Sequence, residues 1–150
     1  GALFTLEPGH PNTLVPRKRP IHTIIPAFMS RGDTHIGFGI LGGWNQAQAH
    51  AQFVAHVVDY GMNIQQAFEA GRFTQFGFNG CDLIMESKVP ASEIETLRSL
   101  GHEISVMPPR TGFFGMGSAA MSNGSGVNFG SSDPASDGAS IPQAPAVFVR

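Results

Sequence analysis

The chain has 150 residues, of which 41% are hydrophobic and only 13% are charged, and its formal net charge is −2. This composition excludes an intrinsically disordered chain, and the weak negative charge gives no electrostatic basis for binding nucleic acid or a membrane surface. The one cysteine, Cys81, excludes a disulfide within these residues, and no apolar run has the length of a membrane span. We therefore expect residues 1–150 to form a single domain with no nucleic-acid partner and no membrane segment.

The first 20 residues are rich in proline and predict an extended, mostly irregular lead-in. The basic cluster Arg17-Lys18-Arg19 lies between two prolines, where it either belongs to a solvated loop or binds an anion directly. The chain begins at Gly1 rather than at a methionine, and its opening reads like the interior of a domain. We therefore expect a processed or truncated piece of a longer protein.

Residues 22–30 and 34–41 are apolar runs of β-like composition, separated by Arg-Gly-Asp at 31–33. A short glycine-containing segment between two such runs predicts a β-hairpin. The tripeptide also matches an integrin-binding motif, but the strand patterns on both sides favour the hairpin.

Residues 44–60 have the spacing of a helix that ends at Gly61, and Asn63 is a suitable cap for a short second helix through Ala70. At about 100° per residue the polar side chains form a narrow stripe, so we expect most of the first helix to be covered. The stripe contains Asn45, Gln48, Gln52, His56 and Asp59; the opposite face contains Trp44, Ala47, Ala51, Val54, Ala55 and Val58, flanked by Phe53 and Val57.

The second half of the chain predicts a strand at 81–87, a helix between Pro90 and Gly101, and a strand at 103–107. The helix places Ile94, Leu97 and Leu100 on one face. Asn123-Gly124, between two alternating runs in 117–133, predicts a further hairpin. The order β-β-α-α-β-α-β-β-β suits an α+β fold with helices layered on antiparallel sheets.

Several stretches, in this order, resemble the C-terminal part of the small subunit of gamma-glutamyltransferases (gamma-glutamyltranspeptidases). They are HPNTLVPRKRPIHTIIP, GGWNQAQAHAQFVAHVVDYGMNIQQAFEAGRF, SLGHEI, GSAAM and GSSDPASDGA. These enzymes are N-terminal-nucleophile hydrolases, and the resemblance implies part of an αββα sandwich with antiparallel sheets between helical layers. It also implies a self-cleaving precursor whose new N-terminal threonine attacks a gamma-glutamyl amide to form an acyl-enzyme, which water or an amine releases.

The glycine pair Gly42-Gly43 lies between the predicted strand 34–41 and the predicted helix 44–60. Glycines here either make a tight turn or let a ligand approach the backbone. The resemblance implies that their N–H groups form the oxyanion hole. Peptide amides at a helix start suit this role, since they are unpaired and lie at the positive end of the helix dipole.

The substrate pocket departs from the family pattern. Two serines that hold the substrate's α-carboxylate in the family correspond to His22 and Thr23, which still donate hydrogen bonds. The family's acidic residue for the substrate's α-ammonium corresponds to Leu3, which cannot pair with a cation. An alternative is therefore an enzyme resembling cephalosporin acylases, which would hydrolyse glutaryl-type amides.

No residue of this chain matches the N-terminal threonine, because Gly1 is first and the amine of Thr5 lies in a peptide bond. We therefore expect the chain alone to be inactive, and its partner to be the large subunit or the remainder of the precursor in a homo- or hetero-oligomer. A second alternative is a catalytically inactive binding subunit. We expect no cofactor.

Other reactive side chains fit structural roles. His50, His56 and His102 lack a cysteine or carboxylate at ligand spacing, so no metal is expected, and Cys81 lacks a paired base. Asp133 and Asp137 are interpreted as turn caps. Trp44 either forms the floor of the acyl pocket or belongs to the core.

Overall fold

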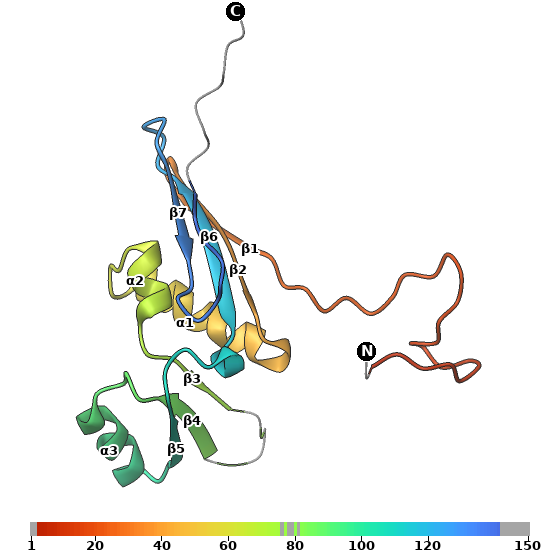
Figure 1. The fold of residues 1–150 in the computed structure, drawn as a ribbon, viewed down its shortest axis with the longest axis horizontal. Helices are drawn as coiled ribbons and strands as arrows, with labels where there is room; N and C mark the ends of the chain where they lie inside the picture. Colours follow the sequence, from red (N-terminus) through yellow and green to blue (C-terminus); the bar gives the residue numbers. More distant parts are fainter. Residues whose placement is uncertain (1–2, 76, 78–79, 81, 142–150) are drawn as a thin grey trace, which may run out of the picture.

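The computed structural model describes residues 3–75, 77, 80 and 82–141. A four-stranded antiparallel sheet has the order β1-β2-β6-β7, and a three-stranded sheet has the order β3-β4-β5 (Figure 1). The first sheet contains β1 (Ala27–Arg31), β2 (Thr34–Leu41), β6 (Met116–Ser122) and β7 (Asn128–Ser132); the second contains β3 (Phe73–Thr74), β4 (Asp82–Glu86) and β5 (Glu103–Met107). The helices are η1 (Gly43–Asn45), α1 (Gln46–Val58), α2 (Ile64–Glu69), α3 (Ala91–Ser99) and η2 (Gly112–Phe114).

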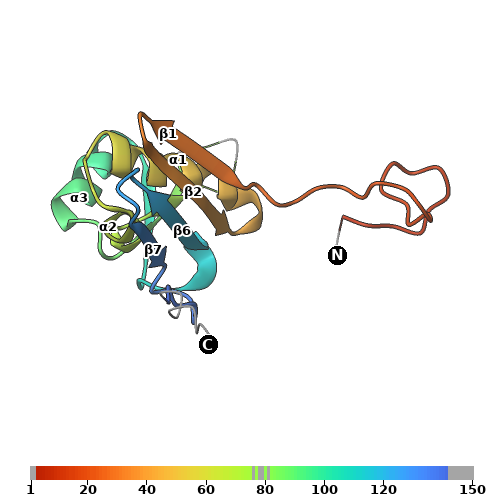
Figure 2. The same cartoon turned by 90° about the horizontal axis from the view of Figure 1, so that it is seen from above.

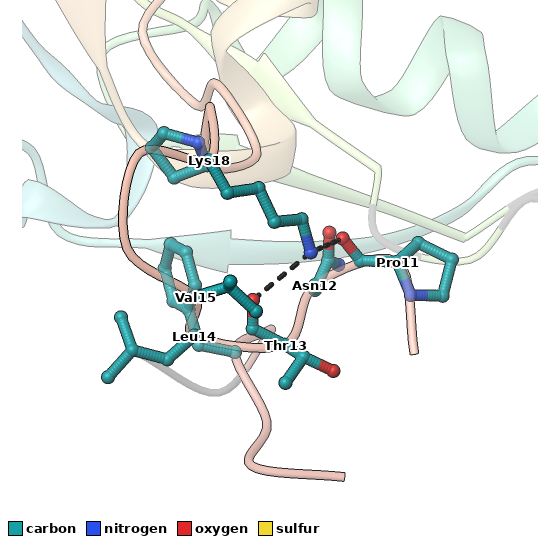
Figure 3. Close-up of a pocket in the computed structure, with 8 residues that line it drawn as sticks. Pro11, Asn12, Thr13, Leu14, Val15 and Lys18 are labelled. Atoms are coloured by element: carbon teal, nitrogen blue, oxygen red, sulfur yellow. Dashed lines mark hydrogen bonds between the residues drawn. The ribbon is translucent and has the colours of Figure 1, made fainter. Parts of the chain in front are cut away.

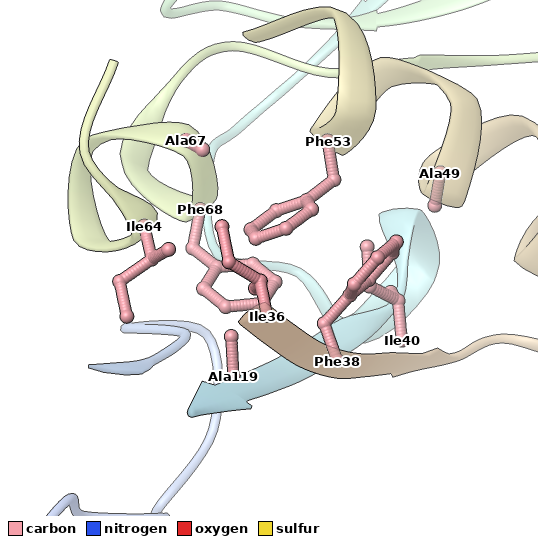
Figure 4. Close-up of a cluster of buried hydrophobic side chains, with 9 residues drawn as sticks. All are labelled: Ile36, Phe38, Ile40, Ala49, Phe53, Ile64, Ala67, Phe68 and Ala119. Carbon is pink, nitrogen blue, oxygen red and sulfur yellow. The ribbon is translucent and has the colours of Figure 1, made fainter. Parts of the chain in front are cut away.

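The core lies between one face of the four-stranded sheet and the helices α1 and α2 (Figure 4). Alternate residues of β2 point into it, as a half-buried strand requires. Phe53 of α1 contacts both the sheet and the second helix. Its ring centroid lies 4.5 Å from that of Phe38 on β2 and 4.6 Å from that of Phe68 on α2. The buried cluster is Ile36, Phe38, Ile40, Ala49, Phe53, Ile64, Ala67, Phe68 and Ala119.

The predicted hairpin at Arg-Gly-Asp is confirmed, because Arg31 pairs with Thr34 across a turn in which Gly32 has φ 56°. The first strand begins at Ala27 rather than at residue 22. Pro26 immediately before it has no N–H to donate to a sheet ladder.

The buried face of α1 differs from the predicted one. Asn45, Gln46, Ala49, His50 and Phe53 are buried, whereas the predicted apolar face is largely exposed, with 74% of Trp44 accessible. Gln46 and His50 turn inward because backbone groups are available to pair with them: Gln46 donates to the Thr23 carbonyl, and His50 accepts from the Ile40 amide. A helical periodicity analysis counts such side chains as solvent-facing.

Two glutamines of α1 pair with the backbone of β3 and of Gln75, the residue that follows it, as a neighbouring strand would. Gln52 accepts from the Phe73 amide at 3.0 Å and donates to the Phe73 carbonyl at 2.9 Å. Gln48 makes the same pair of bonds with Gln75, at 3.0 and 2.9 Å. These side chains fasten the three-stranded sheet to the helical layer.

The predicted helix ends are confirmed. Gly61 follows α1 with φ 67°, and Asn63 caps α2 in a capping box with Gln66. Gly101 follows α3 with φ 98°. On α3, Ile94 is buried but Leu100 is exposed, so only part of the predicted apolar face packs.

The second sheet is mixed rather than antiparallel throughout, because β3 and β4 pair antiparallel whereas β4 and β5 pair in parallel. The segment between β4 and β5 contains α3, which makes a crossover unit. The two-residue strand β3 was not predicted. The α+β class with helices on antiparallel sheets is nevertheless confirmed.

The hairpin predicted around Asn123-Gly124 is present, but its loop spans 123–127 rather than two residues. Asn123 accepts a hydrogen bond from the Ser125 amide at 3.1 Å, and Gly124 has φ 76°. The side-chain cap therefore stabilises a longer turn than the dipeptide alone predicts.

The N-terminal segment is irregular, as predicted, and extends away from the sheets (Figures 1 and 2). Lys18 donates to the carbonyls of Pro11 and Thr13, the latter at 3.0 Å, which closes a loop (Figure 3). This favours the loop interpretation of the basic cluster. Among the described residues, no helix is long and apolar enough to cross a membrane.

Candidate active site

The centre of the site is the turn where β2 passes into the helical layer. Gly42 has φ 151° and Gly43 has φ 58°, so both residues lie in the half of conformational space that favours glycine. The turn is followed at once by η1 and α1. The expected change from strand to helix at this glycine pair is therefore confirmed.

The hydrogen bonds of the turn leave its amides available. The Gly42 carbonyl accepts from the Asn45 amide at 3.1 Å, and the Gly43 carbonyl accepts from the Gln46 amide. Among the described residues, the amides of Gly42 and Gly43 donate to no backbone or side-chain acceptor. Free donors at the start of a helical segment are a ready position for a negative charge.

The turn borders a largely apolar hollow of about 840 Å³. The end of β2, the start of β6 and residues 23–26 form its walls. A second hollow adjoins Gly43 on the side of the N-terminal segment. Its lining contains Leu3, Ile21, His22, Thr23, Ile25, Gly43, Trp44 and Gln46.

The structure brings the predicted pocket residues to the glycine turn. Gln46 donates to the Thr23 carbonyl at 2.9 Å, which ties that segment to the start of α1. His22 and Thr23 are exposed and share the second hollow with Gly43. Trp44 lines the same hollow and lies outside the buried core. No carboxylate lines either hollow among the described residues.

A buried ion pair lies behind the turn and was not predicted. The Arg72 Nη1 atom is 2.8 Å from the Asp133 Oδ2 atom and donates to the Gly115 carbonyl at 3.2 Å. Asp133 also accepts from the Ala135 amide at 2.9 Å, which confirms its role as a turn cap; Asp137 stays a prediction. The sequence signal was weak, since one arginine and one aspartate 61 positions apart form no local motif.

His50 and His56 contact backbone groups of the fold. His50 Nε2 accepts from the Ile40 amide at 2.9 Å, and burial lowers the pKa of His50 below its usual 6.5. His56 lies 3.2 Å from the Ala67 carbonyl. Within the described part of the chain, no group of three or more His, Cys, Asp or Glu side chains could hold a metal. Cys81 lies outside the described residues.

The helical layer on an antiparallel sheet has the fold of the N-terminal-nucleophile hydrolases. The chain is similar over 91% of its length to a solved gamma-glutamyltranspeptidase from Pseudomonas nitroreducens, with 19% identity, a TM-score of 0.71 and 70% of that chain covered. It is also similar to a solved cephalosporin acylase from Bacillus halodurans, with 35% identity, a TM-score of 0.76, and 95% of this chain and 26% of that one covered.

The family model for gamma-glutamyltranspeptidase matches residues 2–143. The chain therefore belongs to the gamma-glutamyltranspeptidase family. It is 32% identical over 145 residues to the glutathione hydrolase-like YwrD proenzyme of Bacillus subtilis, covering 94% of this chain and 28% of the relative. It is 30% identical over 143 residues to the oxamate amidohydrolase proenzyme of Klebsiella pneumoniae, covering 93% and 27%. The chain thus spans just over a quarter of these curated relatives.

Proposed function

We propose that these residues form the C-terminal portion of the small subunit of a gamma-glutamyltransferase-like amidohydrolase and supply its oxyanion hole. The observation that carries the proposal is the pair of unpartnered amides at Gly42 and Gly43 beside an open hollow. Both glycines have positive φ, so the chain uses a special backbone conformation to make this turn. Family membership supplies the reaction class.

In the proposed reaction an N-terminal threonine of the larger precursor attacks the carbonyl carbon of an amide. Its α-amine accepts the hydroxyl proton, and the carbonyl π electrons move onto oxygen, which becomes negative. The Gly42 and Gly43 amides donate to this oxygen and stabilise the tetrahedral intermediate by a few kcal/mol, about 2.7–4 for one such donor in a comparable site. The C=O bond then re-forms, the C–N bond breaks, and the α-ammonium gives its proton to the leaving nitrogen, which departs as an amine. Water or another amine then attacks the ester and releases the acyl group, and the threonine hydroxyl is restored.

His22 and Thr23 are proposed to hold a carboxylate on the acyl portion of the substrate. Their position beside Gly43, fixed by the bond from Gln46 to Thr23, supports this assignment. Leu3 lines the same hollow and offers no charge to an α-ammonium. This supports the alternative substrate class, glutaryl-type amides, as does the similarity to a cephalosporin acylase.

The remainder of the precursor is the proposed partner, in an assembly of more than one chain. Large apolar side chains are exposed on η1 (Trp44), on the outer face of α1 (Val58), and on the sheet face opposite the helices (Phe28 and Leu41). Apolar side chains gathered at such faces are typical of surfaces that another part of a fold covers. The proenzyme relatives, of which this chain spans just over a quarter, support the same partner.

The test is to express the complete polypeptide that contains these residues and measure hydrolysis of gamma-glutamyl-anilide and glutaryl-anilide. We expect the complete polypeptide to hydrolyse at least one of the two anilides. We also expect an acyl adduct on a new N-terminal threonine, visible by mass spectrometry. Preference for the glutaryl amide would select the acylase alternative. No turnover and no adduct with either substrate would refute the enzyme and favour a binding subunit.

A further inference from the structure

Arg72 is a buried cation directly behind the glycine turn. It precedes β3, and its side chain and that of Asp133 are only 4% and 1% exposed. Burying two charges is costly, and a well-packed apolar pair is often at least as stable. Stability alone therefore does not explain this ion pair, and the contacts of the guanidinium indicate a further role.

The guanidinium reaches the turn through Gly115. Arg72 Nη1 donates to the Gly115 carbonyl at 3.2 Å. Gly115 packs so closely against the turn that a Cβ on it would collide with the Leu41 carbonyl oxygen, and a Cβ on Gly42 would lie 3.4 Å from the Gly115 Cα atom. Movement of Gly115 would therefore be transmitted to the Leu41–Gly42 peptide group, which carries the Gly42 amide and immediately precedes Gly43.

Hydrogen bonds of their own backbone groups anchor both members of the ion pair to neighbouring strands. The Arg72 amide donates to Glu86 Oε2 at 3.0 Å, and the Glu86 amide donates to the Arg72 carbonyl at 2.9 Å. The Asp133 amide donates to the Gly117 carbonyl at 2.9 Å. These bonds anchor the pair to β4 and β6, so the guanidinium is held at a defined position.

The packing around the turn also contains buried polar atoms without partners. Asn45 is 1% exposed, and among the described residues neither of its side-chain amide atoms nor Arg72 Nε has a hydrogen-bond partner. The Asn45 Nδ2 atom lies 3.5 Å from the positions that a Cβ would take on Gly42 and on Gly115. Incompletely satisfied polar groups of this kind are rare in cores, and functional sites are one place where they are retained.

We propose that Arg72 is a positioning residue that sets the direction of the Gly42 and Gly43 amides through Gly115, and that Asp133 holds its guanidinium in place. This inference rests on the proposed function of the glycine turn. Loss of Arg72 should lower kcat, because the amides would no longer meet the developing oxyanion. It should leave KM nearly unchanged, because Arg72 lines neither of the two hollows beside the turn, whereas His22 and Thr23 do.

The test uses the complete polypeptide and the double variant Arg72→Met/Asp133→Leu, which replaces the ion pair by apolar side chains. We expect a melting temperature near that of the wild type, a fall in kcat of about 10- to 100-fold and a KM within about twofold. The control is Arg98→Met, which removes the exposed ion pair with Glu95 on α3 and should leave kcat unchanged.

A folded double variant with wild-type kcat would overturn the inference. If neither this variant nor Arg72→Met folds, Asp133→Asn decides, because it removes the charge that holds the guanidinium while keeping nearly the same side-chain shape. A fall in kcat of about tenfold at unchanged KM would then support the inference, and a wild-type kcat would overturn it. The wild-type protein is assayed first. If it hydrolyses neither anilide, the proposed function itself is refuted, independently of any Arg72 variant.

Discussion

Replacement of Gly43 by alanine separates the proposed catalytic role of the turn from its backbone geometry. Gly43 has φ 58° and Gly32, in the β1–β2 turn, has φ 56°. A Cβ at either position would meet no atom within 4 Å. The two substitutions therefore impose nearly the same backbone strain and the same lack of steric conflict, but only one is next to the proposed oxyanion.

Both variants should lose about 1–2 kcal/mol in free energy of unfolding, the cost of a left-handed conformation for a residue with a Cβ. Only Gly43→Ala should also lose activity, because its methyl group enters the space bordering both hollows. The expected fall in kcat is about 10²- to 10³-fold, comparable with loss of one oxyanion donor. Gly32→Ala should keep the wild-type kcat.

The measurements are urea unfolding and anilide hydrolysis, made on the complete polypeptide with each substitution in turn. Equal losses of stability with a rate loss confined to Gly43→Ala would support the oxyanion assignment. If the two variants hydrolyse the anilide equally fast, the reasoning is refuted and the glycine pair is only a turn.

The buried His50 predicts a pH dependence: its lowered pKa means that the unfolded state takes up the proton first, so stability should fall as pH drops below about 6.5. Urea unfolding from pH 7.5 to 5 should show this fall weakened in His50→Leu, and an unchanged pH profile would contradict it. Asn63→Ala should cost about 1 kcal/mol through loss of the α2 cap, measured by the same method, and a loss near zero would argue against the capping box. Gln52→Ala should speed hydrogen exchange at the Phe73 amide, which loses its acceptor; unaltered exchange would show that the glutamine does not hold β3.

The sequence predicted those elements that depend on a few neighbouring residues. The hairpin at 31–33, the cap at Asn63 and the glycine that ends α1 each depend on a few neighbouring residues, and each is present. The position of the glycine turn between strand and helix followed from the same kind of signal. The order of elements was predicted apart from the short strand β3.

Features that depend on distant backbone groups were not predictable in this way. The orientation of α1 is set by bonds from Gln48, Gln52 and His50 to backbone atoms of β3, Gln75 and β2, which periodicity does not record. The parallel pairing of β4 and β5 depends on a crossover rather than a turn. Arg72 meets Asp133 only after the whole chain has folded.

In their contact with the β3 segment, the side chains of Gln48 and Gln52 on α1 bond only to its peptide groups. Such a junction is indifferent to the identity of the side chains at 73 and 75, since any residue other than proline presents the same donor and acceptor. The junction between α1 and the three-stranded sheet can thus accept sequence change at 73 and 75 while its geometry persists, provided that the side-chain amides of the two glutamines remain.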